Sequence, residues 1–212
     1  MNTGEWQERI SNRTDLTQGL AHLTKPNEEL DSFRVLMKIL KEKKIKGSVN
    51  TIVNGRPRGY ICGDDSVVCF QDVPLFSLSE NILYEQKLRK EKQDSPIRYG
   101  AFGLRFDKRY IFKKGGRPVI YEVTETAKSF LPKDEYWRIV RFDLENGDNL
   151  IDWTHEREWR LRGDLDFELK DVEILLSHEF SVSQMYSYCQ KNDMLDIFSN
   201  VKGIVTLKSL VF

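Results

Sequence analysis

The chain has 212 residues, of which 40% are hydrophobic and 31% are charged. This composition is typical of a globular protein and excludes a disordered polypeptide, because enough apolar side chains are present to form a core. Lysine plus arginine equals aspartate plus glutamate at 33 each, so the formal net charge is zero. A balanced charge argues against nucleic-acid binding by bulk electrostatics, although it leaves room for a local basic groove.

The sequence also indicates where such a protein would work. It contains no run of 18 apolar residues, so we expect no membrane-spanning segment. The N-terminal residues, MNTGEWQERISNRTD, are polar and partly acidic, unlike a secretory signal. The three cysteines are widely spaced and form no Cys-x-x-Cys pair, so no zinc site is expected. We therefore expect a cytoplasmic protein without a bound metal.

Apolar periodicity predicts many short strands, with helices early and late in the chain. A capping box, Ser77-Leu78-Ser79-Glu80, is expected to open the second helix. The expected helices are 30–40, 77–92 and 181–198, and the expected strands are 19–24, 66–70, 97–106, 117–123, 137–144, 152–161, 172–176 and 203–207. Since strands and helices do not alternate regularly and no linker is evident, the sequence predicts one α+β domain over residues 1–212, with a mostly antiparallel sheet.

The most unusual segment is Asp-Trp-Thr-His-Glu-Arg-Glu-Trp-Arg at residues 152–160, which combines charges with two indoles. Side chains alternate between the two faces of a strand. A strand here would point Trp159 and Leu161 into the core and leave Glu156, Glu158 and Arg160 along an open cleft. Taken alone, the same pattern also fits a surface ion pair between Glu158 and Arg160, worth less than about 1 kcal/mol.

Several segments occur together in an order that resembles known families. GLAHLT (19–24) resembles the first-strand His-x-Thr of DarT-like ADP-ribosyltransferase toxins. The segments VVCFQDVPL (67–75), RYGAFGLRFDK (98–108), GGRPVIYE (115–122) and HEREWR (155–160) resemble motifs of the AbiGi family and of a related domain family associated with bacterial phage defence. The resemblance implies an ADP-ribosyltransferase-like fold, a split antiparallel β-sandwich with flanking helices around a cleft for NAD.

The resemblance also implies roles for individual residues. Glu158 matches the late-strand catalytic glutamate, and Glu156 matches a position that orients or deprotonates the acceptor. The residues expected to bind NAD, either at its ribose or by stacking on nicotinamide, are His22, Thr24, Tyr99, Phe102 and Tyr121. Arg56 and Arg58, in NGRPRGY, do not belong to the matching motifs; they are candidates to contact the NAD phosphates or a nucleic-acid acceptor, although a solvated turn on a loop explains them more simply. NAD would be consumed as a substrate, and the acceptor would be RNA, DNA or protein.

Each of these residues also has a simpler interpretation. His22 is explained equally by a satisfied core histidine, Thr24 by a helix cap, and Phe102 by a core aromatic. The resulting hypotheses are an NAD-dependent transferase of a toxin–antitoxin or phage-defence system, with an antitoxin among its expected partners, and a non-catalytic binding module on the same scaffold. A Mg²⁺-dependent hydrolase using Asp152, Glu156 and Glu158 is a third, weaker alternative.

Overall fold

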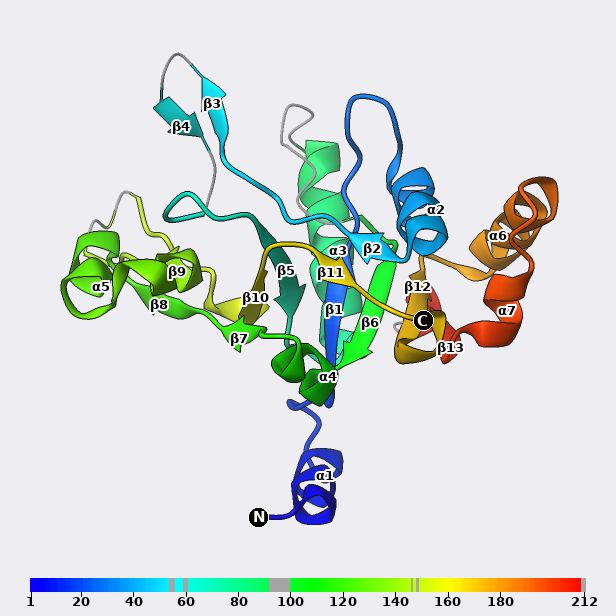
Figure 1. Ribbon diagram of the computed structural model, residues 1–212, viewed down its shortest axis with the longest axis horizontal. Helices are drawn as coiled ribbons and strands as arrows, with labels where there is room; N and C mark the ends of the chain where they lie inside the picture. Colours follow the sequence, from blue (N-terminus) through cyan, green and yellow to red (C-terminus); the bar gives the residue numbers. More distant parts are fainter. Residues whose placement is uncertain (54–55, 59–60, 92–99, 146, 148, 211–212) are drawn as a thin grey trace. The chain divides into compact units, whose positions relative to one another are not determined.

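A computed structural model describes residues 1–53, 56–58, 61–91, 100–145, 147 and 149–210, and these form a mixed α+β structure. The chain divides into two compact units (Figure 1). Unit 1 comprises Met1–Lys44, Val73–Lys108 and Asp166–Phe212, and unit 2 comprises Ile45–Asp72 and Arg109–Leu165. The predicted α+β class is confirmed. That the chain acts as a single domain stays a prediction, as does the finer transferase-like architecture.

Among the described residues of unit 1, four strands pair in the spatial order β13-β12-β6-β1. Their bounds are β1 (Gly19–Leu23), β6 (Gly103–Asp107), β12 (Val172–Leu176) and β13 (Gly203–Thr206). The pairs β1–β6 and β12–β6 are antiparallel, whereas β12–β13 is parallel. Most side chains of β12 are buried on both faces, which is why its sequence VEILL is a nearly continuous apolar run.

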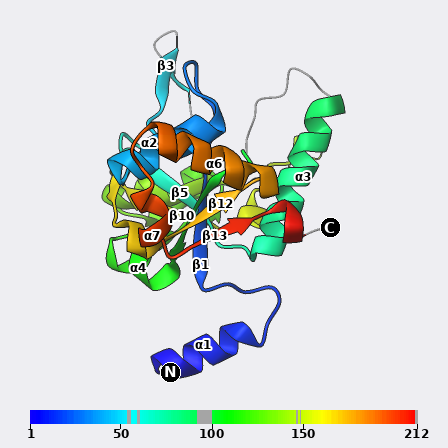
Figure 2. The same ribbon diagram turned by 90° about the vertical axis from the view of Figure 1, so that its right-hand side faces the viewer.

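The helices of unit 1 flank these strands, except the N-terminal helix, which lies apart from them in both ribbon views (Figures 1 and 2). Their bounds are α1 (Thr3–Ser11), α2 (Ser32–Glu42), α3 (Leu75–Glu91), α6 (Glu179–Lys191) and α7 (Asp196–Asn200). Figure 2 shows α2 and α3 on opposite sides of the strands. On the α3 side, Leu78 and Ile82 join a buried cluster with Ala21 and Leu175. Helix α2 begins after Asp31, whose carboxylate accepts the Arg34 N–H at 2.8 Å.

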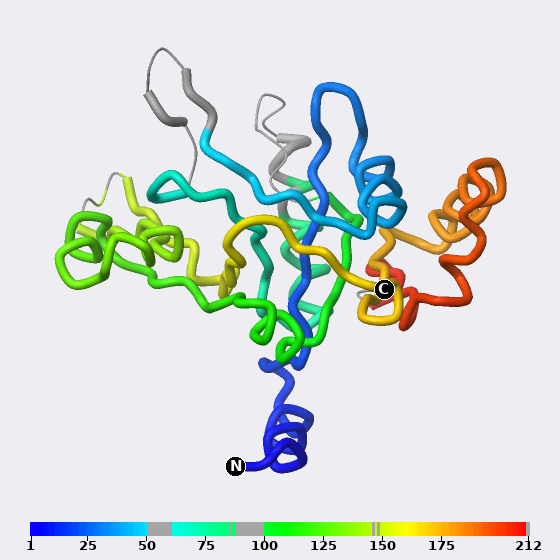
Figure 3. Tube along the Cα trace, in the orientation of Figure 1, coloured from blue at the N-terminus to red at the C-terminus, as the bar shows by residue number. Residues whose placement is uncertain are grey.

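Unit 2 contains a three-stranded arrangement in the order β5-β10-β7, all antiparallel. These strands are β5 (Val67–Gln71), β10 (Glu158–Arg162) and β7 (Arg117–Pro118), and Figure 3 shows that β5 and β10, far apart in sequence, run side by side. The other elements are an antiparallel pair, β3 (Thr51–Val53) with β4 (Arg56–Arg58), a parallel pair, β8 (Ile120–Glu122) with β9 (Ile139–Arg141), helices α4 (Lys108–Lys113) and α5 (Thr124–Phe130), and 3-10 helices η1 (Lys133–Arg138) and η2 (Thr154–Glu156).

The remaining elements lie where the chain passes between the two units or near its end. These are β2 (Lys44–Ile45), β11 (Leu165–Asp166), η3 (Leu169–Asp171) and η4 (Lys208–Leu210).

None of the helices in the described part of the chain combines the length and apolarity that a membrane span requires.

Several predicted elements are wrong in extent because local backbone chemistry overrides the apolar pattern. The strand predicted at 137–144 starts only at Ile139, since η1 follows Pro132. The helix predicted over 181–198 is interrupted near Asp193, which has a left-handed φ of 57°. Helix α3 starts at Leu75, so Ser77 does not cap it. The Ser79 hydroxyl instead lies 2.9 Å from the Leu75 carbonyl oxygen and 3.1 Å from that of Leu207.

Gly103 is required where β6 meets β1 within unit 1. A Cβ atom at Gly103 would lie 2.3 Å from the His22 carbonyl oxygen, a backbone atom that cannot move aside cheaply. We predict that Gly103→Ala lowers the free energy of unfolding by about 1–3 kcal/mol or more, as overpacking does elsewhere. Urea denaturation measures this loss. Gly147→Ala is the control, because nothing lies within 4 Å of its added Cβ. Equal stabilities for the two variants would contradict the close approach.

Candidate functional site around Glu158

The segment singled out in the sequence is not one continuous strand. Residues 154–156 form η2, and Arg157 adopts a left-handed φ of 44° before β10 begins at Glu158. The turn is set by Asp152, whose Oδ1 accepts the Thr154 N–H at 2.9 Å and the Thr154 hydroxyl at 2.6 Å. The prediction that Glu156 and Glu158 share one strand face is therefore wrong, because Glu156 precedes the strand and is half-buried.

The two faces of β10 also differ from the prediction. Leu161 is buried as expected, but Trp159 is only partly buried and donates its indole N–H to Asp72 Oδ2 at 3.2 Å. Glu158 and Arg160 do not line an open surface, since only 7% and 1% of their areas are exposed. Both faces of the strand are thus covered, and the charged pair belongs to the interior of unit 2.

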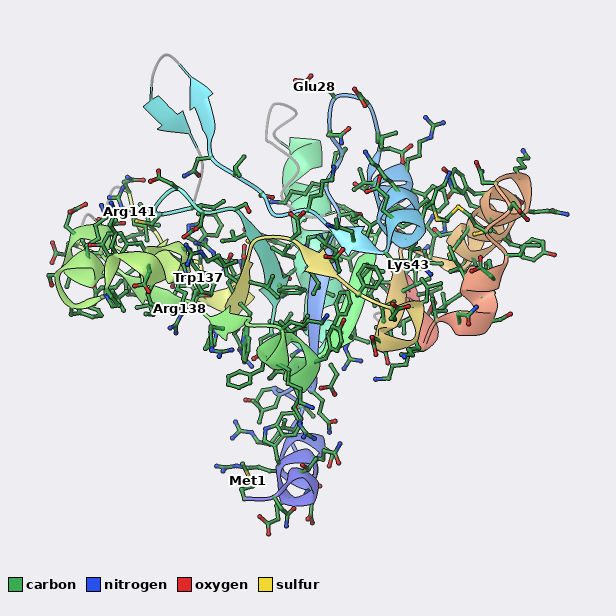
Figure 4. The ribbon with its side chains drawn as sticks, viewed as in Figure 1. Met1, Glu28, Lys43, Trp137, Arg138 and Arg141 are labelled. Atoms are coloured by element: carbon green, nitrogen blue, oxygen red, sulfur yellow. The ribbon has the colours of Figure 1, made fainter. Side chains whose placement is uncertain are left out.

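Glu158 and Arg160 form a two-point ion pair. Arg160 Nε lies 2.8 Å from Glu158 Oε1, and Nη2 lies 3.4 Å from Oε2. Arg160 Nη1 donates to the carbonyl oxygens of Trp137 at 2.8 Å and Ile139 at 3.1 Å. The guanidinium therefore links β10 to the η1–β9 segment, on which Figure 4 labels Trp137 and Arg138. The longer contact leaves Oε2 the less firmly engaged of the two carboxylate oxygens.

Tyr121, on β8, lies beside the start of β10. The Glu158 N–H donates to the Tyr121 hydroxyl oxygen at 2.7 Å. The pKa of Tyr121 is raised to about 12, mainly by burial; the N–H hydrogen bond from Glu158 opposes this shift and the negative charge of Glu158 adds to it. The phenol therefore keeps its proton at neutral pH, and this proton has no acceptor among the residues that the structure describes.

Gln71 lies directly across from Glu158 in the β5–β10 register. The backbone carbonyl of Glu158 accepts the Val119 N–H, and the backbone N–H of Glu158 donates to the Tyr121 hydroxyl. The hydrogen-bonding groups of the Glu158 backbone therefore face away from β5. Gln71 and Glu158 are thus a non-hydrogen-bonded pair, in which Cα atoms are about 4.5 Å apart and side chains share one face. Gln71 Oε1 is buried without a hydrogen-bond partner among the described residues, an arrangement that costs about 1–3 kcal/mol.

The residues expected to bind NAD from unit 1 lie near the end of β1. His22 is half-buried opposite Leu104, and it makes an interaction of its own. Thr24 is 1% exposed, and its hydroxyl lies 2.9 Å from the Ser32 carbonyl oxygen and 3.0 Å from that of Phe102. The Phe102 ring packs edge-on against Phe33, with centroids 5.6 Å apart. Thr24 and Phe102 therefore have structural roles in unit 1.

The side chains of three other predicted site residues are not described by the structure. Tyr99 lies outside the described residues. Arg56 and Arg58 lie on β4, paired with Val53 and Thr51 of β3, and their side chains are not described. Within the described ranges, no cluster of three histidine, cysteine, aspartate or glutamate side chains could hold a metal ion.

Two features escaped the sequence analysis. One is Gln71, whose signal was a polar side chain ending the otherwise apolar strand Val-Val-Cys-Phe-Gln. The other is a cavity of about 470 Å³ in unit 1, bordered by Thr17, Arg105 and Lys202 among others. Gly19 makes room for the Arg105 guanidinium there, since a Cβ at that position would lie 2.2 Å from Arg105 Nε. The sequence gives no signal for this contact, because Gly19 lies opposite Asp107 and only diagonal to Arg105, a relation that becomes visible only in the strand register.

We compared the chain with protein-family models, with curated proteins and with solved structures, and found no match in any of the three.

The ion pair makes a prediction about stability. Arg160→Met would leave the Glu158 carboxylate buried without its partner, so we expect a loss of about 3–5 kcal/mol in the free energy of unfolding. The double variant Glu158→Gln/Arg160→Met removes both charges and should regain part of that loss. Chemical denaturation of the single and double variants measures the coupling. Additive losses would contradict a direct interaction.

Tyr121 makes a prediction about alkaline pH. A folded-state pKa of about 12 lies above the value of about 10 expected in the unfolded chain, so the unfolded state releases the proton first. The stabilising contribution is complete below pH 10 and is lost as the pH rises through 12. Spectrophotometric titration should show a late-ionising tyrosine that Tyr121→Phe removes. The same number of late-ionising tyrosines in the wild type and in Tyr121→Phe would refute the assignment.

Proposed function

We propose that the chain is an NAD-dependent ADP-ribosyltransferase that modifies a nucleic acid or a protein, as an effector of a toxin–antitoxin or phage-defence system. The observation that carries the proposal is the Glu158 carboxylate, which Arg160 holds in a fixed position while one of its oxygens keeps only a 3.4 Å contact. The order of motifs that resembles phage-defence families and DarT-like transferases supports the same assignment.

The proposed reaction breaks the bond between nicotinamide nitrogen and ribose C1′. The bonding electrons pass to the nicotinamide ring, which becomes neutral, and positive charge develops on the ribose, as in glycoside cleavage. The acceptor then forms a bond to C1′ and loses a proton. A fixed carboxylate beside the ribose stabilises this charge more strongly in the transition state than in the ground state. Glu158 has the chemistry for that role.

The pairing with Arg160 does not remove the acceptor capacity of Glu158. A carboxylate has about four lone-pair sites, and Arg160 occupies two of them. A ribose hydroxyl would use the remaining sites, which requires the groups that leave only 7% of Glu158 exposed to admit it, and the arginine fixes the direction in which these sites point. Tyr121 adds a protonated phenol at the backbone of the same residue. In this proposal Glu156 orients or deprotonates the acceptor, and it does so from η2 and not from the strand face.

One observation favours a second candidate, a non-catalytic binding module such as an antitoxin or partner-recognition protein. Such a module is expected to neutralise Glu158 with an arginine, and Arg160 makes contacts with both oxygens of the carboxylate. Under this alternative the pair has only a structural role, and the chain neither binds nor consumes NAD.

Transfer of label from NAD separates the two candidates. Incubation of the protein with labelled NAD and, in parallel, RNA, single-stranded DNA or cell lysate should label one of the three. We predict that Glu158→Gln lowers the transfer rate about 100- to 1,000-fold, the typical effect of removing one electrostatic contact to a transition state. NAD should still raise the melting temperature of the variant, because ground-state binding uses other contacts as well.

Two controls make this prediction specific. Glu125→Gln removes an exposed carboxylate of the same unit, with 82% of its side chain accessible, and should retain full activity. Glu158→Asp keeps a negative charge beside Arg160, so it replaces the glutamine variant in the transfer assay if that variant does not fold. Full transfer by a folded Glu158→Gln, or the absence of any NAD-dependent thermal shift in the wild type, would overturn the proposal and favour the binding module.

A further inference from the structure

We infer that Gln71 is a positioning residue that binds the ribose hydroxyl next to the one that Glu158 binds, so that the two side chains together recognise the vicinal diol of NAD. This inference rests on the proposed function and assigns a role to a residue that the motifs did not. Gln71 Oε1 is the observation that supports it. Among the described residues, it is the only buried side-chain nitrogen or oxygen atom without a hydrogen-bond partner.

A stable fold rarely keeps such an atom without a reason. Buried polar groups are almost always paired, and exceptions concentrate where function requires them. An apolar side chain of similar size at position 71 would fit a strand that is otherwise Val-Val-Cys-Phe. The glutamine amide, 6% exposed, is therefore better explained by a partner that arrives with a ligand than by the packing of unit 2.

The position of Gln71 is suited to act with Glu158. The two residues are opposite each other in a non-hydrogen-bonded pair, the kind in which facing side chains approach most closely. They make no hydrogen bond to each other among the described contacts, so neither satisfies the other. Two side chains on adjacent strands, pointing to the same face, can meet two neighbouring groups of one ligand.

The hydrogen-bonding capacities identify the ligand group. Glu158 offers acceptor sites only, whereas the Gln71 amide offers an acceptor oxygen and donor N–H groups, exchanged by a half-turn of the amide. Tyr121 offers a free O–H donor at the backbone of Glu158. A vicinal diol complements this set, because each hydroxyl both donates and accepts. With Glu158 at the ribose 2′-hydroxyl, Gln71 is placed to bind the 3′-hydroxyl.

The experiment compares NAD with two analogues that lack either the 2′- or the 3′-hydroxyl of the nicotinamide ribose. For the wild type we expect kcat/KM to fall about 3- to 10-fold without the 3′-hydroxyl, the size of one hydrogen bond to a neutral group. Gln71→Met should lower kcat/KM for NAD by a similar factor and respond equally to NAD and the 3′-deoxy analogue. It should still discriminate against the 2′-deoxy analogue, which reports on Glu158.

Stability provides a second readout. Because Gln71 Oε1 has no partner to lose, Gln71→Met should leave the melting temperature of the ligand-free protein unchanged or raise it. A purely structural role predicts a lower melting temperature and no change in discrimination between the analogues. Gln190→Met, on the exposed surface of α6, is the matched control for the loss of an amide.

The outcomes separate this inference from the proposed function. If Gln71→Met still discriminates against the 3′-deoxy analogue, the proposed role of Gln71 is wrong. The proposed transferase activity is unaffected by that result. Absence of label transfer by the wild type overturns both. If Gln71→Met does not fold, Gln71→Asn keeps the amide but withdraws it by one methylene group. It should then lose most of the 3′ discrimination, and full retention would refute the inference.

Discussion

Unit 2 depends on the buried ion pair between Glu158 and Arg160. A guanidinium with 1% of its area exposed is stable only if its donors are satisfied, and Arg160 meets this condition through the carboxylate and the carbonyl oxygens of Trp137 and Ile139. These contacts join β10 to η1 and β9, which are far apart in sequence. The same interaction fixes the carboxylate that the proposed chemistry needs, so stability and the proposed function would share one arginine.

The surroundings of Glu158 contain polar groups that folding alone does not use. Tyr121 keeps a proton without an acceptor in the described part of the chain, and Gln71 keeps a carbonyl oxygen without a donor. A site optimised only for stability would provide an acceptor for the Tyr121 proton, and would pair the Gln71 oxygen or replace Gln71 with an apolar side chain. Their presence next to a fixed carboxylate is what a polar ligand with several hydroxyl groups would require.

The sequence predicted best where apolar periodicity decides the outcome. Strand 172–176 was predicted with its observed bounds, and the helix 30–40 differs from α2 by two residues at each end. It failed where short-range chemistry competes with that pattern. Asp152 forms a turn with Thr154 that delays β10 until Glu158, so the expected pairing of Glu156 with Glu158 on one face does not occur. The burial of Arg160 was also missed, because its carbonyl partners lie more than 20 residues away and become visible only in three dimensions.

The central claim is that the Glu158 carboxylate binds the ribose of NAD while it remains paired with Arg160. A crystal structure with a non-cleavable NAD analogue, in which the ribose ring oxygen is replaced by carbon, tests this directly. We predict a ribose 2′-hydroxyl within hydrogen-bond distance, about 2.6–3.2 Å, of a Glu158 oxygen, with the Arg160 contacts intact. An analogue bound elsewhere, or a Glu158 that contacts only Arg160 in the presence of saturating analogue, would contradict it.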